Sequence, residues 1–406
     1  MDEESSSLSE FSAVDATLGY LYQVRSALLW ALRRLKTEPD FTVAVETLDD
    51  VAFETPLGEP TTLLQTKHHR TRTASLTDFS PDVWKTLRIW FEGHEHGEIP
   101  GTASLFLLTT ASAAPNTAAY WLRSENRDVQ KAQQALDTVA GTSTNKANKP
   151  GYSAYLRTSP NKRSAILERI TVIDAAPSIN DVDRELRQEV YWAVSKEYQE
   201  PFLQRLEGWW FRRVIQQLSG SPSERIGSVE LEAKMADLRE QFKQESLPID
   251  EDLLQFTLDD EISSTYSGFR FMKQLDIIDA GKNRVAAAMR DYYRAYEQRS
   301  RWVREKLVGR LDLSKYEKRL SEEWELVFEA MRDELGTDAT DIIKKKAARS
   351  ILAWAEQTNI TIRREVTEPF VCRGSFQMLS DEIKIGWHPE FRDLLSSLLE
   401  VEEGAA

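Results

Sequence analysis

The sequence predicts an α/β domain at the N-terminus, followed by a mostly α-helical C-terminal domain. Up to about residue 173, short apolar and β-branched runs alternate with amphipathic stretches, which indicates strands packed against helices. From Val182 onward the pattern changes to long helices rich in arginine and glutamate. Between the two patterns, residues 174–181 (DAAPSIND) have the composition of a linker. We therefore expect domains at residues 1–175 and 176–406.

The N-terminal elements can be assigned in order. Residues 14–36 are predicted to form an amphipathic helix, because leucines recur on one face at helical spacing. Residues 41–50, 51–55 and 61–64 have the pattern of strands, and the segment 56–60 (PLGEP) has the composition of a turn. The remaining predicted elements are a helix, a buried strand, a polar helix and a last helix-to-strand element, at residues 78–91, 102–110, 124–139 and 166–173.

The hairpin at residues 41–69 supplies candidate catalytic residues. If its last two strands pair, Asp50 lies at the start of one, and Gln65 and Lys67 share a face near the end of the other. Asp50 offers carboxylate oxygens and Gln65 an amide oxygen, and both suit a hard cation such as Mg²⁺. Lys67 brings a positive point charge to the same place. This set of groups can hold a metal-bound water in line with a phosphodiester and stabilise the charge that develops as it attacks.

These residues resemble a known family of nucleases. An acid, a hairpin and then Gln65-x-Lys67 are similar to the PD-(D/E)xK nuclease fold, in the variant where glutamine replaces glutamate. The stretches GYLYQ at 19–23, ETLDD at 46–50 and QTKHH at 65–69 resemble, more particularly, the nuclease domain attached to SAVED-type effectors of bacterial cyclic-oligonucleotide defence. That domain recurs in the ABC-three-component (Lamassu) anti-phage systems. The resemblance implies a mixed central sheet with helices on both faces.

The same resemblance implies roles for individual residues. Asp50 and Gln65 are the expected ligands of Mg²⁺ or Mn²⁺, and Lys67 is the expected catalytic lysine. Gln23 and Glu46 have supporting roles, with Glu46 as a further metal ligand. Glu46 lies on the same side as Asp50 only if the first strand runs unbroken between them. The choice of Asp50 over Asp49 depends on register, because a slip of one residue turns the acid to the other face.

Two basic segments are candidate contacts to a phosphate backbone. The first directly follows the hairpin, and the second, residues 144–163, contains no acidic residue and has Tyr152 and Tyr155 interleaved with its basic residues. A solvated or flexible loop remains the alternative for each segment. The candidate DNA-binding residues are His68, Arg70, Arg72, Lys146, Lys149, Arg157, Lys162 and Arg163.

The C-terminal domain shows charged helices without a clear catalytic constellation. Its aromatic residues Tyr292, Tyr293, Tyr296 and Trp302 are interpreted as core or as a helix-packing seam, and residues 360–366 (ITIRREV) as a short strand. Two stretches, RLEGWW at 205–210 and the segment 373–389 that begins RGS and ends GWHP, resemble the C-terminal domain of ABC-three-component effectors. The predicted helices are at residues 183–198, 201–218, 229–245, 276–307, 316–335, 342–359 and 391–399.

The composition limits the classes of function. The single cysteine, Cys372, excludes a disulfide within the chain and is typical of a reducing cytosol, so we expect a cytoplasmic protein. No apolar run approaches the roughly 20 residues that a membrane helix needs, and the acidic, serine-rich N-terminus is unlike a signal peptide. The net charge of −14 argues against a free-standing nucleic-acid binder. It favours local basic clusters, self-assembly or delivery by a partner.

The leading hypothesis is a metal-dependent endonuclease that cuts double-stranded DNA as the effector subunit of a bacterial defence complex. The resemblance implies an SMC-like ABC ATPase and a small middle subunit as partners, which keep the nuclease silent until foreign DNA is sensed, and a homo-oligomer as the active form. One alternative is a non-catalytic, nuclease-like scaffold, because Gln65 leaves the metal one less negative charge than a carboxylate would. Another is an RNA-cutting enzyme on the same fold.

Overall fold

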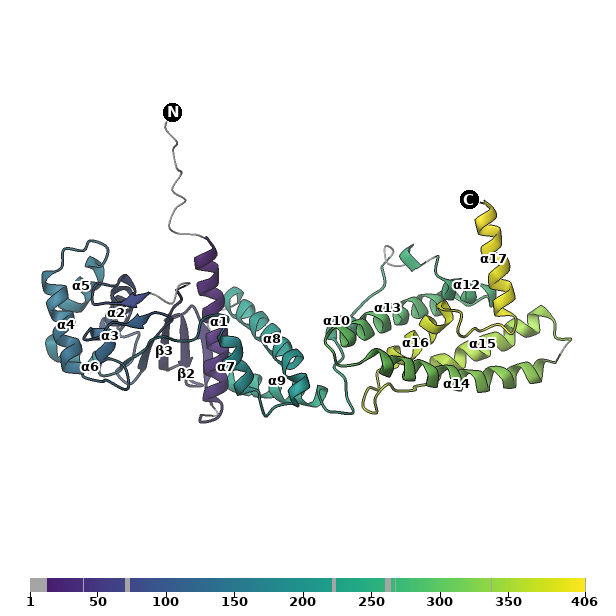
Figure 1. Cartoon of the computed structure of the whole chain (residues 1–406), viewed down its shortest axis with the longest axis horizontal. Helices are drawn as coiled ribbons and strands as arrows, with labels where there is room; N and C mark the ends of the chain where they lie inside the picture. The colour runs from purple at the N-terminus through teal and green to yellow at the C-terminus, as the bar shows by residue number, and fades with distance from the viewer. Residues whose placement is uncertain are drawn as a thin grey trace, which may run out of the picture. The chain divides into compact units, whose positions relative to one another are not determined.

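The computed structural model describes residues 13–38, 40–69, 74–220, 224–259, 264–266, 268–336 and 338–405. The chain forms two compact units, Met1–Leu238 and Arg239–Ala406 (Figure 1). The predicted boundary at residue 175 therefore lies inside the first unit. The physical reason is that the segment after residue 175 packs on the N-terminal helix and adds an edge strand to the N-terminal sheet.

The first unit is built on a six-stranded mixed sheet with the strand order β7-β5-β3-β2-β1-β8. The strands β8, β1, β2 and β3 are antiparallel neighbours, whereas β3, β5 and β7 are parallel. A separate two-stranded sheet pairs β4 with β6. The strands are β1 Thr42–Val45, β2 Val51–Glu54, β3 Pro60–Lys67, β4 Ser75–Leu76, β5 Ser104–Thr109, β6 Ser112–Ala113, β7 Ile170–Ile173 and β8 Ile226–Gly227. The sheet confirms the α/β, mixed-sheet part of the predicted fold class, while the nuclease fold itself stays a prediction.

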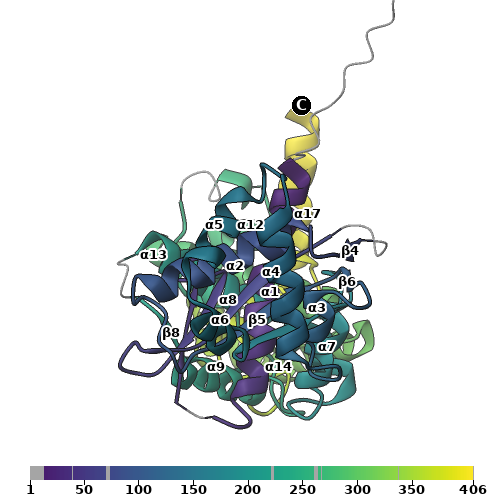
Figure 2. The ribbon, with the colours of Figure 1, turned by 90° about the vertical axis from the view of Figure 1, so that its left-hand side faces the viewer.

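Helices lie on both sides of this sheet (Figures 1 and 2). The helix α1 runs along one face with α7 and α8, and α2 to α6 lie on the other. The helices are α1 Ala13–Arg34, α2 Pro81–Glu95, α3 Ala118–Trp121, α4 Val129–Thr142, α5 Lys149–Arg157, α6 Pro160–Leu167, α7 Val182–Glu189, α8 Gln199–Ser219 and α9 Ser228–Gln241, with the 3-10 helix η1 Lys196–Tyr198 between α7 and α8.

Alternation along β3 decides which of its side chains meets which layer. Thr62 and His68 contact α1, through a hydrogen bond with Arg34 and a ring contact with Tyr22. Leu63 instead packs in the core that α2 to α6 form on the opposite face. Because side chains alternate between faces along a strand, the odd-numbered positions from Leu63 to Lys67 face α2 and the even-numbered positions face α1. Thr61, beside the register shift at Phe53/Glu54, is an exception and contacts Arg34 of α1.

Two local predictions for the first unit are wrong. The first strand ends at Val45, and residues 46–50 form a tight turn in which Glu46 has a φ of 54° and its amide donates to the carbonyl of Asp50 at 3.0 Å. The segment 144–163 is largely helical rather than a flexible loop, because Pro150 and Pro160 lie in the first turns of α5 and α6, where proline starts a helix.

The second unit is helical, as predicted. Its helices are α10 Glu251–Leu254, α12 Arg270–Ile277, α13 Lys282–Arg304, α14 Arg310–Leu335, α15 Asp341–Gln357, α16 Pro369–Asp381 and α17 Phe391–Ala405. The predicted helix at 276–307 is interrupted between α12 and α13, where Asp279 has a φ of 51°. The predicted strand at residues 360–366 is wrong, since this segment has no regular secondary structure.

The core of the second unit is formed where α13 and α16 pack closely together. At Gly374 a Cβ atom would lie 2.0 Å from the carbonyl oxygen of Asp291, so only glycine permits this approach. Tyr292 and Trp302 are buried, which agrees with the predicted core, but Tyr296 is exposed. Cys372 is buried as well. None of the helices in the described residues is both long and apolar enough to cross a membrane.

Candidate active site

The register of the hairpin places Asp50 at the start of β2, as predicted. Val51 pairs with Leu64, so Asp50 lies beside Gln65 at the end of the ladder. The Asp50 carboxylate oxygen Oδ2 accepts hydrogen bonds from the backbone amide of Thr66 at 2.7 Å and from its hydroxyl at 2.9 Å. Asp50 therefore fastens the first residue of one strand to the end of its neighbour.

Gln65 and Lys67 occupy odd-numbered positions of β3 and share the face toward α2. Gln65 is 2% exposed, and its Oε1 has no hydrogen-bond donor among the described residues. Lys67 is half-buried; its backbone carbonyl accepts from the amide of Thr110 at 3.1 Å, and its ammonium has no ion-pair partner within the described part of the chain. A buried acceptor and an ammonium that both lack partners among the described residues are candidates for contact with a ligand.

Asp49 is a buried acid on the same side of the sheet. Its Oδ2 accepts from the indole Nε1 of Trp90 at 2.6 Å, and its Oδ1 accepts from the backbone amide of Asp50 at 2.9 Å. Burial raises the pKa of Asp49 to about 7, an effect that the charge of Asp50 increases and that the Trp90 hydrogen bond and Lys67 oppose. The sequence pointed to the acid pair, but only the fold brings Trp90 of α2 to it.

The two residues with predicted supporting roles lie in different places. Gln23 of α1 is buried, and its Nε2 donates to the backbone oxygen of Asp50 at 2.6 Å, so it holds the turn before β2. Glu46 is exposed, because the turn at residues 46–50 replaces the predicted strand between Glu46 and Asp50. Burial raises the pKa of Tyr20 on α1, and the nearby Glu46 carboxylate adds to that shift. Glu46 therefore lies near α1, whereas Gln65 and Lys67 face α2.

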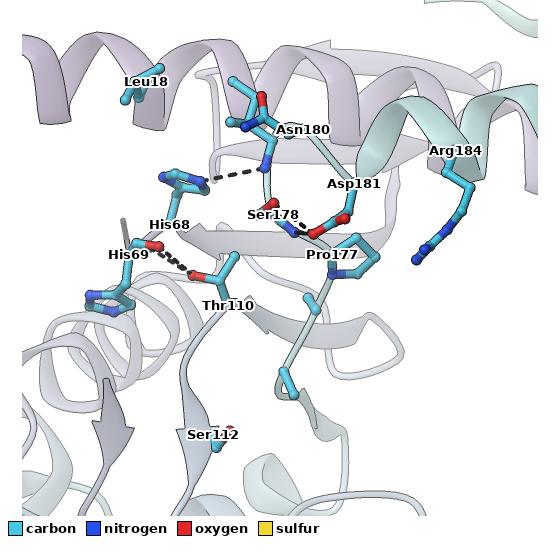
Figure 3. Close-up of a pocket in the computed structure, with 13 residues that line it drawn as sticks. Leu18, His68, His69, Thr110, Ser112, Pro177, Ser178, Asn180, Asp181 and Arg184 are labelled. Atoms are coloured by element: carbon cyan, nitrogen blue, oxygen red, sulfur yellow. Dashed lines mark hydrogen bonds between the residues drawn. The ribbon is translucent and has the colours of Figure 1, made fainter. Parts of the chain in front are cut away.

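A pocket of about 580 Å³ opens at the same end of the sheet (Figure 3). It is lined by the segments that follow β3, β5 and β7, which is where parallel α/β sheets place their ligands. The hydroxyl of Thr110 accepts from the amide of His69 at 2.7 Å, and the amide of Ile179 lies 3.5 Å from His68 Nε2. Sequence reasoning missed this wall of the pocket, because residues 174–181 have the composition of a linker.

The two histidines at this pocket have opposite electrostatic surroundings. His69 Nε2 lies 2.9 Å from Asp82 Oδ2, and the Asp82 carboxylate raises the pKa of His69. Burial lowers the pKa of His68, and the charge of His69 lowers it further. At neutral pH, His68 is therefore a neutral acceptor for the 174–181 segment, while His69 belongs to a pair with Asp82.

The candidate DNA-binding residues are not equivalent. Arg70 and Arg72 lie outside the described residues. Lys146, Lys149 and Lys162 are exposed on or next to α5 and α6. The side chain of Asn148 donates to the carbonyl of Phe79 at 2.8 Å, which attaches the start of α5 to the segment between β4 and α2.

The two arginines of this segment are committed to contacts within the fold. Arg157 lies 3.2 Å from Glu95, and Arg163 is largely buried, 2.6 Å from Asp137 and 4.8 Å from the centre of the Tyr155 ring. The interpretation of Tyr152 and Tyr155 as nucleic-acid-facing aromatics is wrong, because both rings are buried against Trp84.

The oxygen donors at the hairpin fit a hard cation in part. Among the described residues, no group of three or more His, Cys, Asp or Glu side chains is arranged to hold a metal ion. The candidate ligands are instead one carboxylate, Asp50, and one amide oxygen, Gln65 Oε1, whose lack of a donor a cation would relieve. Glu46, the third predicted ligand, does not lie on the face that holds Gln65.

The fold thus combines an α/β unit, which carries a candidate cation site, with a helical unit. Residues 271–395 of the helical unit match the family model of C-terminal domain 7 of the ABC-three component (ABC-3C) systems. This match supports a role in anti-phage defence and, since these systems have several components, the presence of other subunits. It includes the predicted signature at 373–389, whereas the stretch at 205–210 lies outside it, in the first unit.

Two further comparisons complete the picture. No curated protein matches the chain significantly. Among solved structures, the chain is similar to the Cap4 SAVED/CARF-domain containing receptor of Moraxella osloensis, with 14% sequence identity, coverage of 70% of this chain and 69% of that chain, and a TM-score of 0.35.

Proposed function

We propose that the chain is a metal-dependent DNA endonuclease that acts as the effector of an ABC-three-component anti-phage system. The observation that carries the proposal is the face of β3 beside Asp50. There the buried amide oxygen Gln65 Oε1 shares a face with the ammonium of Lys67, and neither has a partner among the described residues. The family match of the helical unit supports the setting in which such an enzyme would act.

Each residue of the site has a role that follows from its chemistry. Asp50 and Gln65 would hold the cation, and when bound, Mg²⁺ or Mn²⁺ would polarise a phosphodiester and acidify a bound water. Lys67 would orient the phosphate and stabilise the negative charge that develops on it. Thr66 fixes the Asp50 carboxylate with two hydrogen bonds, and Gln23 fixes the Asp50 backbone, so Asp50 is oriented before any ligand arrives.

Partners and assembly belong to the same proposal. The exposed lysines near α5 lie on a chain whose net charge is −14, so binding to a DNA duplex would benefit from several copies whose short basic segments converge. An ABC ATPase and a small subunit would hold the effector inactive, and their release would permit this self-assembly.

The test is cleavage of supercoiled plasmid by the full-length chain, alone and with its partner subunits. We expect Mg²⁺-dependent cutting that EDTA abolishes, and a loss of at least roughly 100-fold in Lys67→Ala. The matched control is Lys196→Ala, which removes an exposed lysine of η1 in the same unit and should leave cutting unchanged. RNA of the same sequence, assayed in parallel, separates an RNA-cutting enzyme from a DNA-cutting one.

A nuclease-like scaffold without activity is the second candidate. It is favoured by the small ligand set, since the described residues contain no three-membered group of metal-binding side chains. Absence of cutting in every assembly state, with partners and phage DNA supplied, would establish the scaffold and overturn the enzyme.

A further inference from the structure

We propose that Asp49 is a positioning residue that provides the cation site with the negative charge that Gln65 lacks. This inference rests on the proposed function and deepens it, because it concerns how the same site holds its metal. It concerns a residue that the resemblance did not assign to the site.

The position of Asp49 is fixed from two directions. Its carboxylate accepts from Trp90 Nε1 at 2.6 Å and from the amide of Asp50 at 2.9 Å, and both Asp49 and Trp90 are buried, at 7% and 1% exposure. Trp90 packs in the same core cluster as Leu63, so this carboxylate lies on the α2 side of the sheet. Gln65 and Lys67 follow Leu63 on that side, at the next two odd-numbered positions of β3.

The formal charges of the predicted site do not favour a divalent cation. Asp50 contributes −1, Lys67 +1 and Gln65 zero, which sums to zero. Asp49 changes that sum to −1. Its carboxylate is buried, as Gln65 is, and charges inside a protein interact more strongly than charges at the surface. Asp82 also lies near Lys67, and its carboxylate, 2.9 Å from His69, interacts with both of these groups.

Asp49 acts through its neighbours rather than as a ligand. Each of its oxygens already accepts a short hydrogen bond, one from Trp90 and one from the backbone of Asp50. The bond from the backbone amide of Asp50 orients Asp50, whose carboxylate is the proposed metal ligand. Groups that orient ligands in this way change metal affinity by roughly 10- to 100-fold when they are removed.

The experiment measures binding of Mn²⁺ by calorimetry, without DNA, at roughly pH 8, which is above the raised pKa of about 7 of Asp49. Asp49→Asn keeps the size and shape of the side chain and removes its charge. We expect it to weaken Mn²⁺ binding by about 10-fold. Asp137→Asn, which changes a partly exposed acid elsewhere in the same unit, is the control and should bind Mn²⁺ like the wild type.

Rescue separates a charge effect from a structural one. In the double variant Asp49→Asn/Gln65→Glu the missing charge is restored at the neighbouring position, and Mn²⁺ affinity should return toward that of the wild type. Trp90→Phe, which removes the indole N–H that donates to Asp49, should produce a smaller loss of Mn²⁺ affinity. It replaces Asp49→Asn as the test variant if Asp49→Asn does not fold.

Each outcome decides the proposal. The proposal is overturned if Asp49→Asn binds Mn²⁺ with wild-type affinity, or if Trp90→Phe does so when it is used in place of Asp49→Asn. It is also overturned if Gln65→Glu fails to restore a weakened affinity. If the wild-type chain neither binds Mn²⁺ nor cuts DNA, the proposed function fails, and this inference fails with it. If the wild type cuts DNA and Asp49→Asn binds Mn²⁺ normally, only the role of Asp49 is lost.

Discussion

Each unit buries a glutamine whose carbonyl oxygen has no hydrogen-bond donor among the described residues. Gln65 of β3 is 2% exposed, and Gln377 of α16 is 4% exposed. Gln65 lies beside Asp50 in the ladder and shares a face with Lys67, whose charge interacts with that of Asp49. Gln377 instead lines a pocket of about 300 Å³ beside Arg284, Arg373 and other charged residues. A buried glutamine oxygen that lacks a donor among the described residues thus occurs in both units, with different charged groups around it.

The surroundings decide what an unsatisfied acceptor means. In the second unit, Arg373 Nε lies 2.6 Å from Asp291 Oδ2, and Arg284 forms two hydrogen bonds with Glu356. Guanidinium groups there engage the carboxylates and oppose a second cation. Near Gln65 the proposed site instead contains the acids Asp49 and Asp50 with one lysine, so a cation is the ligand that we propose for this oxygen. A missing donor is informative only together with the charges around it.

The largest effect is expected where α13 and α16 hold the Gln377 pocket together. Gly374→Ala would bring a Cβ to 2.0 Å from the Asp291 carbonyl oxygen, so the helices must separate, at a cost of about 3 kcal/mol or more. Hydrogen exchange of the second unit should rise strongly while that of the first unit stays unchanged. Gly19→Ala in α1, where nothing lies within 4 Å, is the control, and equal exchange in the two variants would contradict the packing argument.

The comparison itself is tested by replacing each glutamine with leucine. Both changes remove a buried acceptor that has no donor, so neither should destabilise its unit strongly. If the proposed site is correct, Gln65→Leu should reduce plasmid cleavage by roughly 10- to 100-fold and weaken Mn²⁺ binding, because a proposed metal ligand is lost. Gln377→Leu should leave both unchanged. Equal cleavage by the two variants would remove Gln65 from the site.

Buried titratable groups should give the two units opposite responses to pH. Burial raises the pKa of Asp49 from 3.8 to about 7, so the folded first unit binds this proton more tightly than the unfolded chain does. Stability linked to Asp49 is therefore lost as the pH rises from about 4 through 7. Asn resembles the protonated acid, so Asp49→Asn should match the wild type near pH 5 and melt higher by roughly 4 °C near pH 8. A lower melting temperature near pH 8 would contradict this.

The smaller pH effect belongs to the second unit. Burial lowers the pKa of His388 from 6.5, an effect that Glu390 and Asp341 oppose. The unfolded chain therefore takes up this proton at a higher pH than the folded unit, and stability falls as the pH drops below about 6.5. His388→Gln should reduce this acid sensitivity, with a gain of roughly 2 °C in melting temperature near pH 5 and none near pH 8. An unchanged acid response would assign the sensitivity to other groups.

Features encoded locally were the ones that could be predicted. The hairpin could be predicted from period-two alternation and from the turn composition of residues 56–60. In the structure, Gly58 of this turn has a φ of 83°. The start of α2 followed from Ser80 and Pro81. The pairing of Gln65 with Lys67 on one face required only that β3 be regular, which it is.

The features that were missed depend on tertiary contacts or on unusual backbone. Nothing marks Glu46 as a residue with positive φ, since glutamate rarely adopts that conformation. The contact between Asp49 and Trp90 joins residues 41 positions apart. The edge strand β8 contains two residues, too few to produce a period, yet it ties the segment after α8 to β1. The same contact places the predicted domain boundary at residue 175 inside the first compact unit.

The position of the single cysteine in the chain has a practical consequence. Cys372 is the single cysteine of the sequence, and it lies 1% exposed in α16, at the centre of the helical unit. A thiol-labelling reagent therefore reports the opening of that unit alone and gives no signal from the first unit. The native chain thus carries an intrinsic reporter of opening in the region that matches C-terminal domain 7 of the ABC-3C systems.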